Sequence, residues 1–230
     1  AFNGGFYDSA SRSFLTSGEK YDGSAAVEHP LGAELWAYVP MNLLPHLKWL
    51  KDKSYTHVYY VDGKPKVFDA KIFADDADNP GGWGTVLVVA MRFGGGVVTV
   101  DTAADGLNSD ANDRDFSSAY IFMDITNPEV EPKLLAEIQV PDGSFSTSYP
   151  AALTIDTNNK WYLIFGSGPT NLATAESSQT AKLYTIDLAS MSIVRTDDTG
   201  IANSFIGDPV SVDWQLNYKA DTVYFGVVGY

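Results

Sequence analysis

The sequence predicts an all-β protein, and three observations support this fold class. Aromatic residues make up 13% of the 230 residues, and tyrosine and phenylalanine occur along the whole chain. Aromatic side chains are enriched in strands, where they cover a pleated surface. Short apolar runs alternate with loops rich in glycine, proline, aspartate and asparagine, as strands alternate with turns. Apolar residues at 45% and charged residues at 19% are typical of a globular core rather than of a disordered chain.

The charge balance of the chain is strongly acidic. The chain has 29 acidic and 15 basic residues, which give a net charge of −14. Such a surface repels nucleic-acid phosphates and anionic lipids, so we expect neither nucleic-acid binding nor membrane insertion. It favours cations, with Ca²⁺ as the first candidate; the alternative is that acidity only keeps a secreted protein soluble. The absence of cysteine excludes disulfides, thiolate catalysis and zinc held by cysteine.

A plan of two strands recurs three times along the chain, starting at Pro65, Pro150 and Pro209. Each copy has a proline, a short apolar strand that ends in aspartate, a polar loop and a second apolar strand that runs into glycine. Proline is tolerated at the start of a strand because no ladder donor is needed there. Aspartate favours a turn at the end of a strand, because its side chain accepts a hydrogen bond from the backbone that follows. The three copies therefore predict three similar strand pairs.

A second pair of strands follows the first two copies. These pairs are residues 119–125 with 133–138, and residues 181–188 with 191–194. Each complete unit then has four short strands, and a repeat of four-stranded units favours the blades of a β-propeller. A β-sandwich is the alternative, because the spacing of the copies is irregular.

The chain is therefore predicted to be a partial β-propeller of four-stranded blades with one short inserted helix. The helix is indicated by Leu43, Leu47 and Leu50 at helical spacing. The blade content is smaller than that of a closed ring, so we expect a fragment of a single propeller domain from a larger protein. The expected division is residues 1–39 as the end of one blade, 40–64 as a helical insertion and linker, 65–139 as a blade, 150–196 as a blade, and 209–230 as the first half of a blade.

Several blocks of the sequence resemble the PilY/PilC-type family of type IV pilus biogenesis factors and pilus-tip adhesins. The blocks are residues 1–5, 31–40, 43–47, 57–65, 81–85 and 91–96. The resemblance implies a C-terminal β-propeller domain and a bacterial protein at the outer-membrane surface or the extracellular pilus tip. It also implies a role in pilus biogenesis, retraction control and surface adhesion. The implied partners are major or minor pilins and a host or abiotic surface ligand.

The same resemblance implies a calcium site in one propeller loop, with oxygen ligands at alternate positions of nine. The matching residues are Asp213, Gln215, Asn217, Lys219 (through its backbone carbonyl) and Asp221. This alternation is also that of an EF-hand loop, which places oxygen atoms around a hard cation. Only two of these side chains are carboxylates, and no glycine stands at the sixth position. The alternative is a β-hairpin whose two aspartates cap the strand ends.

A second acidic loop covers residues 101–115 and contains five aspartates and two asparagines. Asp101, Asp105 and Asp110 are its weaker candidates for calcium ligands. Their spacing fits no single metal-binding template, so the alternative is a solvated loop.

Enzyme signatures are absent from the sequence. It has no Gly-x-Ser-x-Gly motif, no phosphate-binding loop and no His-Glu-x-x-His motif. We therefore expect a protein that acts by binding, with calcium as its modulator, and not an enzyme. Two alternatives stay open. One is a quinoprotein-like periplasmic dehydrogenase propeller, because Trp36 in a Glu-Leu-Trp strand is similar to the blade-locking tryptophans of those enzymes; the other is a purely structural scaffold propeller.

Overall fold

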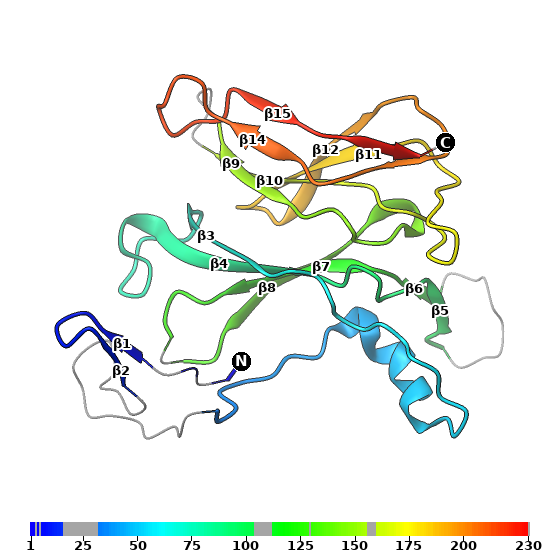
Figure 1. Cartoon of the computed structure of the whole chain (residues 1–230), viewed down its shortest axis with the longest axis horizontal. Helices are drawn as coiled ribbons and strands as arrows, with labels where there is room; N and C mark the ends of the chain where they lie inside the picture. Colours follow the sequence, from blue (N-terminus) through cyan, green and yellow to red (C-terminus); the bar gives the residue numbers. More distant parts are fainter. Residues whose placement is uncertain are drawn as a thin grey trace. The chain divides into compact units, whose positions relative to one another are not determined.

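The computed structural model describes residues 1–2, 4, 6–15, 32–103, 112–128, 130–155 and 160–229 (Figure 1). These residues form two units, which are described separately. One unit is Ala1–Val39 with Asn127–Pro132, and the other is Pro40–Thr126 with Lys133–Tyr230.

The first unit contains one short hairpin. Strand β1 (Phe6–Asp8) pairs antiparallel with β2 (Ser13–Leu15). A single antiparallel bridge joins Phe2 to Glu34, and residues 35–39 form no strand. Most of residues 34–39 are exposed, so a strand there would have no buried face to stabilise it.

The second unit begins with a four-stranded antiparallel sheet in the order β3-β4-β7-β8. Its strands are β3 (Lys66–Lys71), β4 (Trp83–Ala90), β7 (Ala119–Asp124) and β8 (Lys133–Gln139). Burial alternates along β4, as expected for a strand with one face on the core. A separate hairpin of β5 (Val98–Asp101) and β6 (Asp113–Phe116), which the sequence did not reveal, lies between β4 and β7 in the chain.

A second four-stranded sheet repeats this order as β9-β10-β11-β12. Its strands are β9 (Ala151–Thr154), β10 (Trp161–Gly166), β11 (Lys182–Asp187) and β12 (Ser192–Asp198). The two sheets match in detail. The second strand of each begins with tryptophan, the third ends in aspartate, and the pairing of the third strand with the fourth shifts register at one point. The strands predicted from the repeat are thus present in both sheets.

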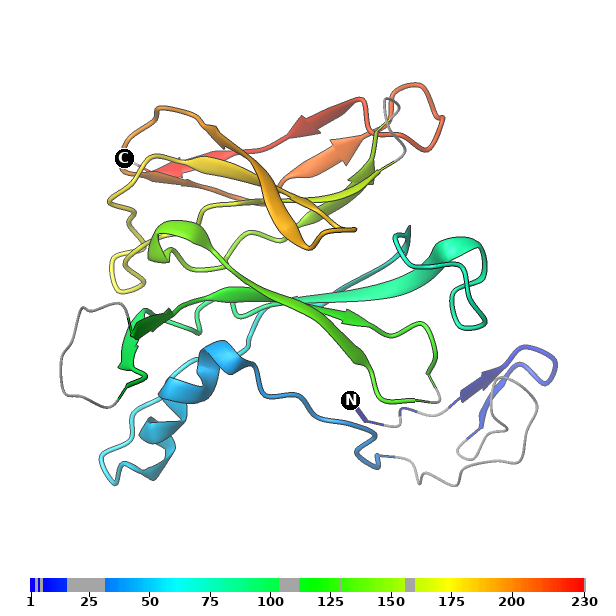
Figure 2. The same cartoon turned by 180° about the vertical axis from the view of Figure 1, so that it is seen from behind.

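The last strands form two further pairs. Strand β14 (Val210–Val212) pairs with β15 (Thr222–Tyr224), and β13 (Ser204–Ile206) pairs with β16 (Val227–Gly229). Residues 223–229 are therefore shared between two strands that pair with different partners. The chain leaves the pairing with β14 after Tyr224, and the carbonyl of Gly226 accepts a hydrogen bond from the Gly207 amide at 2.9 Å. The described residues form no closed ring of sheets (Figure 2).

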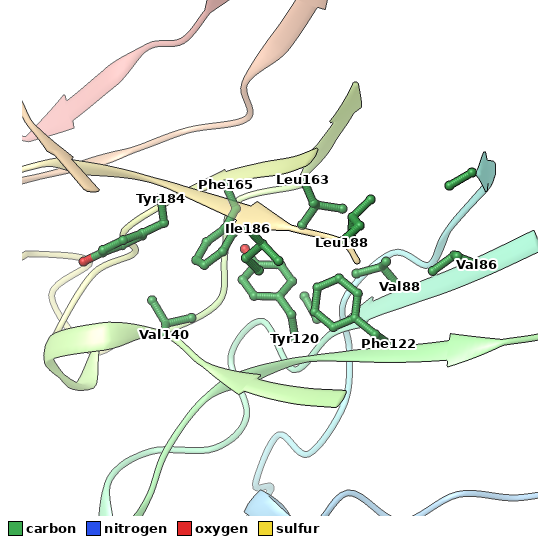
Figure 3. Packing of buried hydrophobic residues seen from close by; sticks show 12 residues of the cluster. Val86, Val88, Tyr120, Phe122, Val140, Leu163, Phe165, Tyr184, Ile186 and Leu188 are labelled. Atoms are coloured by element: carbon green, nitrogen blue, oxygen red, sulfur yellow. The ribbon is translucent and has the colours of Figure 1, made fainter. Parts of the chain in front are cut away.

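The main hydrophobic core lies between the two four-stranded sheets (Figure 3). It joins Tyr120 and Phe122 of β7 to Phe165 of β10 and Tyr184 of β11, all of them almost fully buried. Alternate residues on the other face of the second sheet, such as Ile164, pack in a separate cluster with Ile206 of β13. A sheet that is buried on both faces needs an uninterrupted apolar strand, which explains the run from Trp161 to Phe165.

A row of buried serines also joins the two sheets. Ser144, Ser146 and Ser148 alternate in the segment before β9, and each is at most 1% exposed. The Ser146 hydroxyl lies 2.8 Å from that of Ser118 and accepts a hydrogen bond from the Arg92 amide at 2.8 Å. Because each of these three serine hydroxyls has a partner, the serines do not carry the cost of an unsatisfied group.

A 3₁₀ helix, η1 (Met41–Lys51), occupies the position of the predicted helix. Its buried side chains are Asn42, Leu43 and His46, whereas Leu47 and Leu50 are 37% and 61% exposed. The predicted apolar face was thus wrong. A 3₁₀ helix has three residues per turn, so Leu43 is followed on its face by His46 and not by Leu47.

The start of η1 is fixed by a carboxylate from the first sheet. Glu137 of β8 accepts hydrogen bonds from the amides of Met41 at 2.7 Å and Asn42 at 3.2 Å, and from the Asn42 side chain at 2.7 Å. A negative charge is favourable at this end of a helix, where backbone amides lack helical partners.

Candidate functional site

The loop between β14 and β15 holds the five residues proposed from the sequence as calcium ligands. It is closed at its end by Asp221, whose Oδ2 accepts hydrogen bonds from the amides of Trp214 at 2.7 Å and Gln215 at 3.2 Å. Both amides donate to the same oxygen, which leaves Oδ1 available for other donors or for a cation. Asp221 therefore caps the loop and can still serve as a ligand.

Asp213 organises the middle of the same loop. Its Oδ1 accepts from the Asn217 amide at 3.2 Å and its Oδ2 from the Tyr218 amide at 2.7 Å. Leu216 and Tyr218 have φ angles of 56° and 66°, in the left-handed region that ordinarily favours glycine. Each such residue costs about 1–2 kcal/mol. Tyr218 stands at the sixth position, where an EF-hand loop has its invariant glycine.

The intervening side chains of the loop point into solvent. Trp214, Leu216 and Tyr218 are 66%, 84% and 91% exposed. Oxygen-bearing residues and large apolar residues thus alternate from Asp213 to Tyr218, and we call Trp214, Leu216 and Tyr218 the loop-tip triad. Sequence reasoning missed this triad, although the alternation of Trp, Leu and Tyr with the polar positions was a signal for it.

The donor set of the loop suits a weak calcium site. It offers two carboxylates, two side-chain amides and the Lys219 carbonyl, all of them hard oxygen donors. Calcium takes 6–8 oxygen ligands, so water would complete the shell. Within the described residues, no three histidine, cysteine or acidic side chains are grouped as a metal site. Any calcium site here therefore relies on neutral oxygens for most of its ligands.

The second acidic loop can be assessed only in part. Asp101 is the last residue of β5 and is the register partner of Asp113 in β6. Two carboxylates opposite each other repel, and a cation between them would relieve that repulsion. Asp105 and Asp110 lie outside the described residues.

Comparison with known proteins gives three relevant findings. PilY1, the type IV pilus biogenesis factor of Pseudomonas aeruginosa strain PAO1, is 30% identical over 205 residues, which cover 85% of this chain and 14% of PilY1. A PilY1 homolog of Xylella fastidiosa strain Temecula1 is 26% identical over 196 residues, or 85% of this chain and 13% of the homolog. The crystal structure of the P. aeruginosa PilY1 C-terminal domain matches with a TM-score of 0.56 and 26% identity, over 85% of this chain and 33% of that one. No protein-family model matches.

The stacked antiparallel sheets and these matches make the chain similar to part of a type IV pilus biogenesis factor. The chain is homologous to the C-terminal domain of PilY1. It spans 13–14% of the length of these curated relatives. Among the helices in the described part of the chain, none is both long and apolar enough to cross a membrane.

Proposed function

We propose that the chain is part of a type IV pilus biogenesis factor that acts by binding, not by catalysis, at the bacterial surface or the pilus tip. The observation that carries this proposal is the homology to the PilY1 C-terminal domain over 85% of the chain. The proposed partners are major or minor pilins, together with a host or abiotic surface ligand in adhesion.

We further propose that the chain contributes neighbouring blades of a β-propeller. The supporting observations are the identical strand order of the two four-stranded sheets and the core shared between them. Trp83 and Trp161 begin equivalent strands, and their rings meet edge to face at 5.6 Å. In this proposal, residues 65–139 and 150–196 are the two blades, 209–230 begin another, 1–39 end a preceding one, and 40–64 form the insertion and linker.

The loop-tip triad is the surface that we propose for contact with a pilin. Tryptophan and tyrosine are over-represented among the residues that dominate binding energy at protein interfaces. Three large side chains on one loop, each between 66% and 91% exposed, can bury a substantial apolar area when a partner covers them. Two of the triad residues, Leu216 and Tyr218, have left-handed backbones, and a loop held in one conformation loses less entropy on binding.

Surface piliation tests the proposed function. Deleting the gene in its own bacterium should strongly reduce the number of surface pili, and wild-type protein should restore them. The Trp214→Ser, Leu216→Ser, Tyr218→Ser variant should be secreted normally but bind pilin at least tenfold more weakly in a pull-down. The matched control replaces exposed Val194 and Val67, on other strands, by serine. Normal piliation in the deletion strain would contradict the pilus role, and wild-type pilin binding by the triple variant would contradict the assigned surface.

Calcium binding at residues 213–221 is a separate proposal with its own prediction. With a Kd of about 0.1–1 mM, about 10 mM calcium should stabilise the folded domain by about 2 kcal/mol and raise its Tm by about 5 °C. Asp221→Asn should abolish the shift, because it keeps an oxygen for the two loop amides but removes the charge. Thermal unfolding of the full-length protein with calcium and with chelator measures the effect.

Asp52→Asn provides the matched control for the calcium prediction. Asp52 is exposed, and its Oδ1 accepts the Ser54 amide at 2.8 Å, so the change removes the same charge from a similar turn. The Asp52→Asn variant should keep the full rise in Tm that calcium causes. An equal shift in the Asp221→Asn variant would assign the effect to calcium bound elsewhere.

A further inference from the structure

The residues that precede the three repeated prolines meet at one cavity. Lys64, Tyr149 and Asp208 stand directly before Pro65, Pro150 and Pro209, at the starts of β3, β9 and β14. All three line a cavity of about 430 Å³, within the size range of ligand sites in proteins. The remaining lining residues are Asp62, Gly63, Ala90, Arg92, Ser146, Thr147 and Ser148. The cavity belongs entirely to the second unit and is separate from the loop-tip triad.

The walls of the cavity are held by backbone contacts. The Gly63 amide donates to the Ala90 carbonyl at 3.2 Å, and a Cβ atom on Gly63 would lie 2.2 Å from that oxygen. Only glycine can therefore bring this segment against the end of β4. On the other side, the Ser148 hydroxyl donates to the Gly207 carbonyl at 2.9 Å, and Asp208 Oδ1 accepts from the Tyr149 amide at 2.7 Å. The cavity is thus formed before any ligand arrives.

Two lysines lie at this cavity or next to it: Lys64 is in its lining, and Lys66 lies beside the ring of Tyr149, another lining residue. The Nζ atoms of Lys64 and Lys66 lie 5.1 Å and 4.9 Å from the centre of the Tyr149 ring. Neither forms an ion pair in the described part of the chain, although acidic residues outnumber basic ones by 29 to 15. Burial, and then repulsion from Lys64, lower the pKa of the Lys66 ammonium. Two ammonium groups beside one ring attract an anion, since neither forms an ion pair within the described residues.

The remaining charges at the cavity decide which anion fits. Arg92 is 3.6 Å from Asp62, and Asp208 lies on the rim. Among the lining residues, Lys64 and Arg92 balance Asp62 and Asp208, so Lys66 beside the cavity adds a single uncompensated positive charge. A monoanion matches this balance, whereas the two carboxylates oppose a dianionic phosphate.

We propose that this cavity binds a carboxylate group through Lys64 and Lys66, with the Tyr149 ring against the body of the ligand. The ligand is either a small free monocarboxylate or an acidic side chain of a peptide, which share this chemistry. The proposal goes beyond the pilus role and does not depend on calcium.

Lysine reactivity in the full-length protein tests the proposal site by site. The protein is treated with a limiting amount of acetic anhydride, and acetylation of each lysine is read by mass spectrometry with increasing N-acetylglycine. We expect saturable protection of Lys64 and Lys66, about fourfold when the probe is at three times its Kd. Lys71, an exposed residue at the end of β3, should keep its rate. Sodium chloride at equal ionic strength should not protect, and inorganic phosphate should protect more weakly than N-acetylglycine.

Variants separate the site from a general charge effect. In Lys64→Gln, the apparent affinity for N-acetylglycine, read at Lys66, should fall at least tenfold, while Lys71→Gln should not change it. Asp208→Asn keeps the acceptor for the Tyr149 amide and removes one rim charge, so it should favour phosphate relative to N-acetylglycine. A capped Gly-Glu-Gly peptide distinguishes the sources: protection by the peptide assigns the site to acidic side chains, and protection by N-acetylglycine alone assigns it to a free carboxylate. Equal protection of all lysines, no saturation, or an unchanged affinity in Lys64→Gln would overturn the proposal.

Discussion

Replacing Phe165 by alanine is expected to destabilise the core between the two sheets by about 4 kcal/mol. Phe165 is fully buried, and its ring centre lies 4.5 Å from that of Tyr120 in β7 and 5.3 Å from that of Tyr184 in β11. It therefore contacts both sheets, and its removal leaves a cavity lined by two aromatic rings (Figure 3). The hydroxyl of Tyr120 donates to the Ser148 carbonyl at 2.5 Å, which hinders collapse of the sheets into the space.

Hydrogen exchange of the β7 and β10 amides is the measurement, because it reports opening of this core inside a larger protein. A loss of 4 kcal/mol corresponds to about a thousandfold faster exchange in the slowest amides. Phe165→Leu, which keeps most of the volume, should cost about 1.5 kcal/mol or less. A loss below 1 kcal/mol in the alanine variant would mean that Phe165 does not join the sheets.

Gly168→Ala should cost about 3 kcal/mol or more, although it adds only one methyl group. A Cβ atom at this position would lie 2.0 Å from the Phe145 carbonyl oxygen and 2.8 Å from the Thr147 hydroxyl. The Phe145 backbone cannot easily give way, because its amide donates to the Pro169 carbonyl at 3.0 Å. The added methyl group must therefore separate two paired backbone segments.

Gly226→Ala is the matched control for this second prediction. A Cβ atom on Gly226 would meet no atom within 4 Å, and Gly226 is not among the glycines with a positive φ angle. It should be neutral or slightly stabilising, because alanine restricts the unfolded chain. Unfolding of both variants in urea is measured by near-ultraviolet circular dichroism. Equal unfolding free energies of the two variants would contradict the close packing at Gly168.

The strands that could be predicted are those whose ends are marked by particular residues nearby in the sequence. Proline before β3 and β9 and aspartate at the end of β7 and β11 gave both the position and the order of the strands in the two sheets. The pairing of β13 with β16 could not be predicted in this way. Its two strands have three residues each and are far apart in the sequence, so no local periodicity marks them.

In the candidate sites, too, features of one short segment could be predicted, whereas features that depend on the folded backbone could not. The alternate oxygen positions from Asp213 to Asp221 are legible in the sequence, but the left-handed backbone of Tyr218 is not, since a bulky residue gives no sign of it. Lys64, Tyr149 and Asp208 occupy equivalent places in the repeat. That they share one cavity follows only from the stacking of the sheets that carry them.

The buried serines before β9 affect how the two sheets respond to force. Apolar contacts are non-directional and tolerate small sliding movements, because burial depends on area alone. Hydrogen bonds weaken steeply when distance and angle change, so the bonds of Ser146 to Ser118 and Arg92 define one relative position of the sheets. A sideways pull therefore meets stiff resistance at first, and then breaks several of these bonds together. This join gives the domain a mechanical threshold, which an apolar interface of the same area would lack.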